Sequence, residues 1–315
     1  HHFPAEKHPD LGISSENFSS CAEPDAFLLE NDDIKLPVRT KKSVHKGDFG
    51  HAAVIMGEKA GAAVIAGTAA LSFGAGLVTE VDSGLCRTSF MMNPEVMISD
   101  FMPERTSAVL LGSGLGRSEK SFAVARKVIE KVCEMKNPSV VLDADFFYYE
   151  NIAEVLERLN SISGARVILT PHPKEMHELL RRSSVIEPVD SKSAKHITGR
   201  PRDSEITVSD VCTHRFEYAR QFAQKFPNLV LVSKGADSYI CAGKNCFICD
   251  RGTNALAKAG SGDVLAGLCA ALLAQGYSAV EAAKTAVFAH AEAARSFERS
   301  YECTPLKLAE FLGRM

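Results

Sequence analysis

The stretch VVLDADFFYYENIAEVLERLNSISGARVILT, residues 140–170, indicates the fold of this chain. It opens with VVLDAD (140–145) and closes with RVILT (166–170), two short apolar runs that predict buried strands. The segment between them is long enough for a helix, and a strand–helix–strand succession predicts two parallel strands. Strands that are apolar along most of their length lie in sheets covered on both faces, so we expect helices on each side of this one.

The same alternation continues in both directions along the chain. Residues 62–73, residues 118–135 and the chain from Ser261 onward are predicted to be helical. Only Lys234 to Asp237 separate the last two predicted strands, so these should run antiparallel. The predicted class is α/β, a three-layer α/β/α arrangement with a mainly parallel central sheet. The remaining predicted strands are HAAVIM (51–56), LVTEV (77–81), AVLLG (108–112), LVLVS (229–233) and SYICA (238–242).

Composition is that of an ordinary globular protein and excludes two classes of partner. The 315 residues are 45% hydrophobic and 24% charged, with a formal net charge of -3 and a pI near 6.4. Without a basic excess, we expect neither nucleic acid nor an anionic membrane surface as a partner. No apolar run reaches the roughly 18 to 20 residues of a membrane helix, and the start HHFPAEKHPDLGISS lacks the blocks of a secretory signal. A cytoplasmic location is predicted.

Two segments lie outside the predicted alternation. Residues 1–43 are predicted to be a linker or an N-terminal arm, because they are polar, aperiodic and interrupted by prolines that break regular elements. Residues 44–315 are predicted to form one domain. Within it, residues 181–209 are rich in Ser, Pro and charge and predict an excursion from the fold rather than a domain boundary.

Nine cysteines are present, without the dense spacing of a disulfide scaffold. Cys241, Cys246 and Cys249 lie close together, but a zinc site needs four ligands and no second pair follows at a suitable spacing. We therefore expect a β-hairpin that turns at residues 242–245, with its cysteines acting as small hydrophobic residues.

The strongest chemical signal is NALAKAGSGD, residues 254–263, which runs directly into an apolar helix. Gly260 and Gly262 leave backbone N–H groups uncovered where the helix dipole adds positive potential, so this turn suits a phosphate or a developing oxyanion. Asp263 would repel a phosphate but is well placed to take a proton from a hydroxyl that attacks phosphorus. The alternative is an ordinary helix start with an acidic residue in its first turn.

Three further segments fall at the carboxyl ends of predicted strands, where open α/β sheets gather their ligands. GSGLGR (112–117) allows close approach to its backbone, although its spacing fails the dinucleotide fingerprint. In LTPHPKE (169–175), His172 lies between two prolines and Glu175 could reach a magnesium ion through water. Lys234 and Gly235 add a cation and a flexible turn. The structural alternatives are a plain turn, a rigid helix cap and an isolated pair.

Seven segments, taken in order, resemble the motifs of the ADP- or ATP-dependent NAD(P)H-hydrate dehydratases. They are KGDFGHAAVIMG, GAAVIAG, GSGLG, LDAD, LTPHPKE, SKGADS and NALAKAGSGDVLAG. That family belongs to the ribokinase-like superfamily, and the resemblance covers about residues 44–298. It implies a ribokinase-like fold and, with Mg²⁺, transfer of phosphate from ADP or ATP to the ring hydroxyl of NADH hydrate or NADPH hydrate, followed by elimination. No Walker A, GxSxG or HExxH motif competes with this interpretation.

The resemblance also implies roles for individual residues. Ala62, Gly114 and His172 match positions that contact the hydrated nicotinamide nucleotide, and Asp263 matches the family's acidic residue beside the substrate hydroxyl. Lys174 stands where the family has glycine, which puts substrate positioning in question. The residues implied for the adenine nucleotide and its phosphates are Lys234, Gly235, Ala236, Asp237, Ser238, Asn254, Gly260, Ser261 and Gly262.

Two other functions stay open from the sequence. A kinase of the same superfamily, acting on a vitamin-precursor alcohol, would share the first chemical step, and a nucleotide-binding regulator would share only the fold. The motifs leave ADP and ATP undecided, although their variants favour ADP. The resemblance further implies a homotetramer. Because this domain follows an NAD(P)H-hydrate epimerase in some bacterial chains, it also implies a fused or separate epimerase as partner, with residues 1–40 resembling the joining segment.

Overall fold

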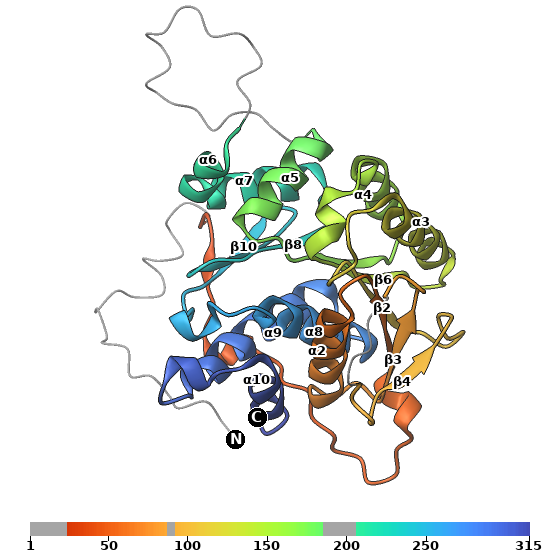
Figure 1. Cartoon of the computed structure of the whole chain (residues 1–315). Coiled ribbons are helices and arrows are strands. Elements are labelled where there is room, and N and C mark those ends of the chain that lie inside the picture. The colour runs from red at the N-terminus through yellow and green to blue at the C-terminus, as the bar shows by residue number, and fades with distance from the viewer. Residues whose placement is uncertain (1–23, 87–91, 185–205) are drawn as a thin grey trace, which may run out of the picture.

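The computed structural model describes residues 24–86, 92–184 and 206–315 (Figure 1). Within these ranges a 10-stranded sheet has the order β1-β10-β9-β8-β7-β6-β5-β2-β3-β4. Most of the excursion predicted at residues 181–209 lies outside the described residues. The strands are β1 (Phe27–Leu28), β2 (His51–Met56), β3 (Leu77–Asp82), β4 (Met97–Ser99), β5 (Ala108–Leu111), β6 (Ser139–Leu142), β7 (Arg166–Leu169), β8 (Leu229–Ser233), β9 (Ser238–Ala242) and β10 (Asn245–Cys249).

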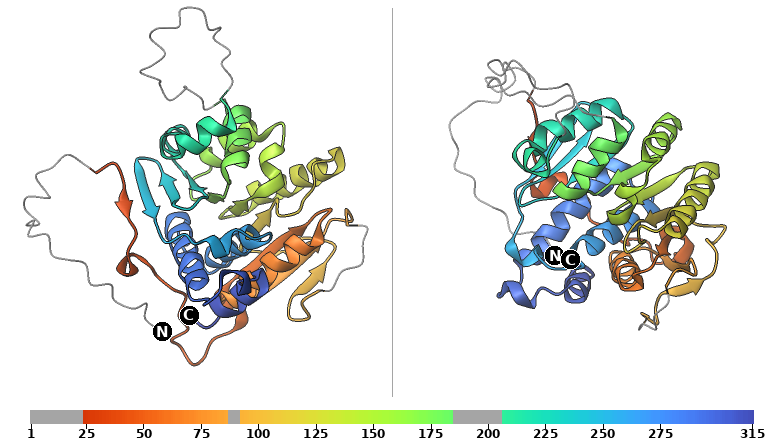
Figure 2. Two further views of the ribbon diagram at one scale, coloured as in Figure 1. Left: turned by 60° about the vertical axis from the view of Figure 1, so that its left-hand side comes forward. Right: turned by 45° about the horizontal axis from the view of Figure 1, so that its top comes forward.

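The sheet is mainly parallel and lies between two layers of helices, which confirms the predicted class. Neighbouring strands from β8 to β4 all run parallel, whereas β9 runs antiparallel to both β8 and β10. The layers are seen edge-on in Figure 2. One layer comprises α3 (Glu119–Glu134), α4 (Ile152–Ser161), α5 (Pro173–Ser183), α6 (Val208–Thr213) and α7 (Arg215–Lys225), and the other α2 (Ala60–Ser72), α8 (Ser261–Ala274), α9 (Ala279–Arg295) and α10 (Pro305–Leu312).

Side-chain alternation along the strands supplies two separate hydrophobic cores. In β2, Ala53 and Ile55 point into the core beneath the α3–α7 layer, whereas Val54 and Met56 point into the core beneath α2 and α8. All positions of β2 are buried, as expected for a central parallel strand. Helix α8 packs against both α2 and the sheet, so its first turn is held rigidly at the sheet edge.

The strand predicted over residues 140–145 is wrong at its carboxyl end. Strand β6 ends at Leu142, and Ala144–Tyr148 form a 3-10 turn, η3. The Asp143 carboxylate instead accepts hydrogen bonds from side chains at neighbouring strand ends. Ala144 then takes a φ of 49°, in the left-handed region. The chain therefore leaves the sheet three residues before the predicted strand end at residue 145.

The expectation that prolines break any regular element in residues 1–43 is also wrong for the part of this segment that the structure describes. The two residues of β1 pair in parallel with β10 at the edge of the sheet, and the next residue, Leu29, is buried. Two 3-10 turns follow, η1 (Asn31–Asp33) and η2 (Lys46–Phe49). Neither residue of β1 is a proline, and an edge strand needs ladder hydrogen bonds on one side only, so prolines elsewhere in the arm do not prevent this pairing.

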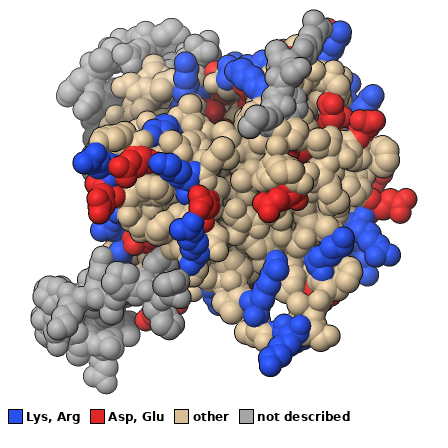
Figure 3. Space-filling model, turned by 60° about the horizontal axis from the view of Figure 1, so that its bottom comes forward, with Lys and Arg blue, Asp and Glu red and all other residues tan. Residues whose placement is uncertain are grey.

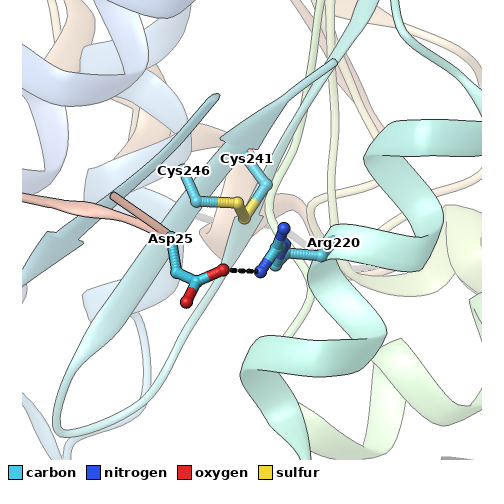
Figure 4. Close-up of a disulfide and its surroundings, with 4 residues drawn as sticks. All are labelled: Asp25, Arg220, Cys241 and Cys246. Carbon is cyan, nitrogen blue, oxygen red and sulfur yellow. Dashed lines mark hydrogen bonds and ion pairs between the residues drawn. A yellow bond between two sulfur atoms is a disulfide. The ribbon is translucent and has the colours of Figure 1, made fainter. Parts of the chain in front are cut away.

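The predicted hairpin of β9 and β10 is present, but two of its cysteines are not free. Cys241 and Cys246 face each other across the hairpin and form a disulfide, which corrects the expectation that they act as small hydrophobic residues. Cys249 stays a buried free thiol. Figure 4 shows the disulfide beside an ion pair in which Arg220 Nη1 lies 2.6 Å from Asp25 Oδ1. This ion pair joins the N-terminal arm to α7.

Among the described helices, none combines the length and apolar character needed to cross a membrane. The face drawn in Figure 3 carries both basic and acidic side chains around a broad area that has neither.

Candidate active site

Asp263 lies in the first turn of α8, directly after the glycine turn that the sequence singled out. The helix begins at Ser261, and Gly260 precedes it with a φ of 91°. A Cβ at Gly260 would lie 2.8 Å from Pro305 Cγ, so both conformation and space require glycine there. Burial, together with the negative charge of Asp143, raises the pKa of Asp263 to about 7. A carboxyl with that pKa can accept a proton near neutral pH.

Lys234 places a positive charge beside that helix start. Its Nζ lies 3.0 Å from Asp143 Oδ1 and 3.8 Å from Glu175 Oε2. A Cβ at Gly262 would lie 3.3 Å from the same Nζ, so the ammonium reaches the backbone of the first turn. Burial disfavours the charged amine, but the charges of Asp143 and Glu175 outweigh that effect and raise the pKa of Lys234. Lys234 therefore keeps its charge in the floor of the site.

A cavity of about 580 Å³ opens where these strand ends and helix starts meet. Its wall contains eight of the residues implied by the resemblance, which the fold brings together from four separate segments: His172, Lys234, Gly235, Ala236, Ser238, Asn254, Ser261 and Gly262. Ala62, Gly114, Glu175, Asp237, Gly260 and Asp263 do not line it. The size suits a nucleotide-sized ligand.

Arg215, at the start of α7, holds the turn between β8 and β9. Its guanidinium donates hydrogen bonds to the carbonyl oxygens of Lys234, at 2.9 Å, and Asp237, at 2.7 Å. A Cβ at Gly235 would lie 1.4 Å from Arg215 Nη1, so the turn needs glycine to accept this arginine. Asp237 therefore contributes its backbone to the turn rather than its side chain to the cavity.

His172 both caps a helix and lines the cavity. Its Nδ1 accepts hydrogen bonds from the backbone N–H groups of Lys174 and Glu175, at 3.1 and 3.3 Å. Glu175 returns the contact by accepting from the backbone N–H of His172 at 2.9 Å, which completes a capping box. The rigid helix cap considered from the sequence is present, and the same geometry presents the ring to the cavity.

Both oxygens of Glu175 already have partners within the protein. Oε1 lies 3.0 Å from His172 Nε2, and Oε2 faces Lys234. Although burial opposes it, the hydrogen bond from His172 and the charge of Lys234 hold the pKa of Glu175 below its usual range. Over the described residues, no group of three His, Cys, Asp or Glu side chains could hold a metal ion. A contact between Glu175 and Mg²⁺ through water stays a prediction.

The GSGLG loop lies beside the first turn of α2, on the other side of Asp143. A Cβ at Gly114, whose φ is 62°, would lie 2.4 Å from the carbonyl oxygen of Lys59 and 2.9 Å from Ala62 Cβ. The loop and Ala62 are thus neighbours, as a shared substrate contact requires. Asp145 holds the loop by accepting from Gly116 N at 3.0 Å and from Arg117 Nε at 2.7 Å.

The sequence alone assigns no role to several residues that build this site. It contains the LDAD motif but does not show that Asp143 lies between Ser113, Thr170 and Lys234, because that position depends on the order of the strands. His290 of α9 bonds to the Ser261 carbonyl oxygen at 3.0 Å, and burial lowers its pKa to about 4, so it is neutral. Nothing in the spacing of residues 261 and 290 reveals that pairing.

These features are typical of α/β proteins that bind a nucleotide at the carboxyl edge of a parallel sheet. A helix start, the Lys234 ammonium and a carboxyl with a pKa near 7 meet at that edge here. A family model described as NAD(P)H-hydrate dehydratase matches residues 52–313. The chain belongs to the NAD(P)H-hydrate dehydratase family, and the resemblance seen in its motifs is confirmed.

Individual relatives agree with this assignment. A bifunctional NAD(P)H-hydrate repair enzyme from Helicobacter pylori is 39% identical over 292 residues, which cover 92% of this chain and 55% of that protein. An ADP-dependent (S)-NAD(P)H-hydrate dehydratase from Neisseria meningitidis is 30% identical, covering 81% of this chain and 80% of that one. The chain spans about half the length of the bifunctional relatives from three bacteria, with 55%, 51% and 53% covered.

Solved structures confirm a ribokinase-like fold. An ADP/ATP-dependent NAD(P)H-hydrate dehydratase from Bacillus subtilis, co-crystallised with ATP/Mg²⁺, superposes with a TM-score of 0.69 at 24% identity, covering 93% of this chain and 98% of that one. A ribokinase-like superfamily protein from Enterococcus faecalis gives 0.62 at 19% identity, covering 94% and 96%.

Proposed function

We propose that this chain is an ADP- or ATP-dependent NAD(P)H-hydrate dehydratase, which returns hydrated NADH and NADPH to their active forms. The observation that carries the proposal is Asp263, a largely buried carboxyl with a pKa of about 7 at the glycine-rich start of α8. Members of the family named for ADP dependence support this substrate class. Ala62, Gly114 and His172 are the proposed contacts to the hydrate.

The proposed chemistry has two steps. Asp263 takes the proton of the ring hydroxyl while the hydroxyl oxygen attacks the terminal phosphorus of the nucleotide. The bond between that phosphorus and the rest of the nucleotide breaks, and the nucleotide leaves with one phosphate group fewer. The backbone N–H group of Gly262 and the ammonium of Lys234 would stabilise the charge that develops on the phosphoryl oxygens. The carbon–oxygen bond then breaks, phosphate departs, and loss of an adjacent ring proton forms the double bond.

Mg²⁺ fits this site as an ion that binds together with the nucleotide rather than in a metal site formed by the protein alone. The described residues form no cage for it, and Mg²⁺ commonly binds through substrate phosphates, water and one or two carboxylates. Bound in that way, it would offset phosphate charge. Glu175, reached through water, is the proposed protein contact, since its own oxygens are held by His172 and Lys234.

The first experiment mixes the protein with NADPH hydrate, Mg²⁺ and either ADP or ATP, and follows the dihydronicotinamide absorbance. A rise that requires one nucleotide supports the dehydratase and identifies the donor. A stable phosphorylated product without an absorbance rise would overturn it in favour of a kinase. Nucleotide binding without either product would favour a regulator.

We also propose the setting in which the enzyme works. Relatives about twice as long are named bifunctional repair enzymes, which supports an NAD(P)H-hydrate epimerase as a partner in the same chain or as a separate protein. We propose a homotetramer and a cytoplasmic location. Sedimentation of the purified chain, with and without an epimerase, measures the first two; a monomer that binds no epimerase would contradict them.

A further inference from the structure

Asp143 is buried at the end of β6 and contacts three separate strand ends. Its Oδ1 accepts from Thr170 Oγ1 at 2.6 Å and from Lys234 Nζ at 3.0 Å, and its Oδ2 accepts from Ser113 Oγ at 3.2 Å. Thr170 follows β7, Lys234 follows β8, and Ser113 follows β5. One carboxylate thus holds the glycine loop on the hydrate side and the cation on the nucleotide side.

The same carboxylate reaches the proposed base through two routes. The Ser113 hydroxyl, which donates to Asp143, also lowers the pKa of Asp263. Lys234, which pairs with Asp143, acts electrostatically on Asp263 as well. Asp143 and Ser113 are almost completely buried, and the Lys234 side chain is 17% exposed. The local field at Asp263 is therefore set inside the protein.

Few other charges face Asp263. Glu175 of α5 adds a negative charge, weaker in effect than that of Asp143. His290, on α9, is neutral because burial lowers its pKa. Helix α2 has no charged residue, and the charged residues of α10, Lys307 and Glu310, are exposed. The balance at Asp263 thus rests mainly on Asp143 and Lys234.

We propose that Asp143 is a positioning residue for the transfer step: it holds the Ser113 hydroxyl and anchors Lys234 beside the first turn of α8, and so controls how Asp263 acts as base. The inference rests on the proposed function only where it says that Asp263 acts as a base in catalysis. The claim that Asp143 controls the protonation of Asp263 does not depend on the identity of the substrate. Asp143 itself touches no reacting atom in this scheme.

The test begins with Asp143→Asn, which keeps the shape and removes the charge. Infrared difference spectra between each protein and its Asp263→Asn derivative titrate the Asp263 carboxyl without any turnover. We expect a midpoint near pH 7 in the wild type and a lower one in Asp143→Asn, because a neighbouring negative charge has been removed. With hydrate and nucleotide, we expect kcat to fall about 10- to 100-fold, since Lys234 loses its anchor.

Asp145→Asn is the matched control, two residues further along the same motif. Asp145 holds Gly116 and Arg117 but has no contact with Lys234. It should raise the KM for the hydrate while the Asp263 midpoint stays in place. Ser113→Ala provides an opposite sign: its hydroxyl lowers the pKa of Asp263, so the midpoint should move to higher pH.

An unchanged Asp263 midpoint in Asp143→Asn, or equal shifts in Asp143→Asn and Asp145→Asn, overturns the inference. If Asp143→Asn does not fold, Ser113→Ala decides, and a midpoint that stays in place there also overturns it. A wild-type protein without dehydratase activity would instead refute the proposed function, while the infrared titration still tests the role of Asp143.

Discussion

Among the described residues, burial raises the pKa of two carboxyls to about 7, and only one of the two belongs to the candidate site. Burial raises both, Asp263 from 3.8 and Glu80 from 4.5. Asp263 has Ser113, Lys234 and Asp143 around it at the edge of the sheet. Glu80 is fully buried in β3, and neither of its oxygens has a hydrogen-bond partner among the described residues. It faces α2, where a Cβ at Gly67 would lie 2.7 Å from Glu80 Oε1.

This difference shows that a raised pKa does not by itself identify a catalytic group. Both shifts have the same leading cause, the loss of water around the charged form. What separates the two carboxyls is the surrounding chemistry: a glycine-rich helix start and a cation at Asp263, and packing against α2 at Glu80. The site is therefore assigned from convergent polar groups, with the pKa as support.

The largest expected effect is on catalysis, from Asp263→Asn. Turnover should fall about 10²- to 10⁴-fold, the usual contribution of a positioned base, while nucleotide still binds. The matched change, Glu80→Gln, should leave turnover within about two-fold, because Glu80 packs against Gly67 of α2, and neither residue lines the cavity. Steady-state kinetics with calorimetric nucleotide binding measures both. Surviving turnover in Asp263→Asn would remove Asp263 from the role of base.

The pH profile of the wild type provides a second catalytic test. If Asp263 is the base, kcat/KM should rise as pH increases through about 7, because only the ionised carboxyl accepts a proton. The rise should have the same midpoint as the Asp263 carboxyl titrated spectroscopically. A midpoint near the ordinary aspartate value would show that Asp263 is solvated in solution, contrary to its buried position here.

Glu80 should instead determine how stability depends on pH. Its folded-state pKa of about 7 lies above the ordinary 4.5, so the protonated form favours folding. The stability is complete below pH 4.5 and falls as pH rises towards 7, by about 3 kcal/mol at pH 8. Glu80→Gln should abolish that part of the fall. Urea unfolding of both proteins at pH 5 and pH 8 measures it, and parallel curves for the two proteins would contradict this account.

Much of this fold could be predicted because its evidence is local. Apolar strands, an alanine-rich helix and glycine turns each lie within a few residues of one another, and the antiparallel β9 followed from its short connection. The end of β6 and the cluster around Asp143 could not be predicted in the same way. They depend on which strands are neighbours, and Ser113, Thr170 and Lys234 are far apart in the chain. The disulfide likewise required the register of the hairpin.

A matched pair of glycines gives a smaller effect on the same two regions. Gly67→Ala would force a methyl group against Glu80, and we expect a loss of about 1–2 kcal/mol, the cost of overpacking reduced by the better helix propensity of alanine. Gly262→Ala places its methyl 3.3 Å from the flexible end of Lys234. Stability should change little there, but nucleotide affinity should fall about ten-fold as the phosphate approach narrows. Equal stability losses would erase the distinction between the two environments.

The smallest effect is expected from a substitution of Lys174, an exposed cation that lies between His172 and Glu175 in the sequence. Its backbone N–H, not its side chain, bonds to His172, so Lys174→Ala keeps that contact. Exposed charges are screened by salt and solvent, whereas Asp143 is buried and is screened much less. Lys174→Ala should therefore leave the midpoint of the kcat/KM profile in place and change turnover less than about three-fold, at low and at high salt. A salt-dependent shift of the midpoint would show that exposed charges such as Lys174 also control the pKa of Asp263. Control of that pKa could then not be assigned to buried groups such as Asp143 alone.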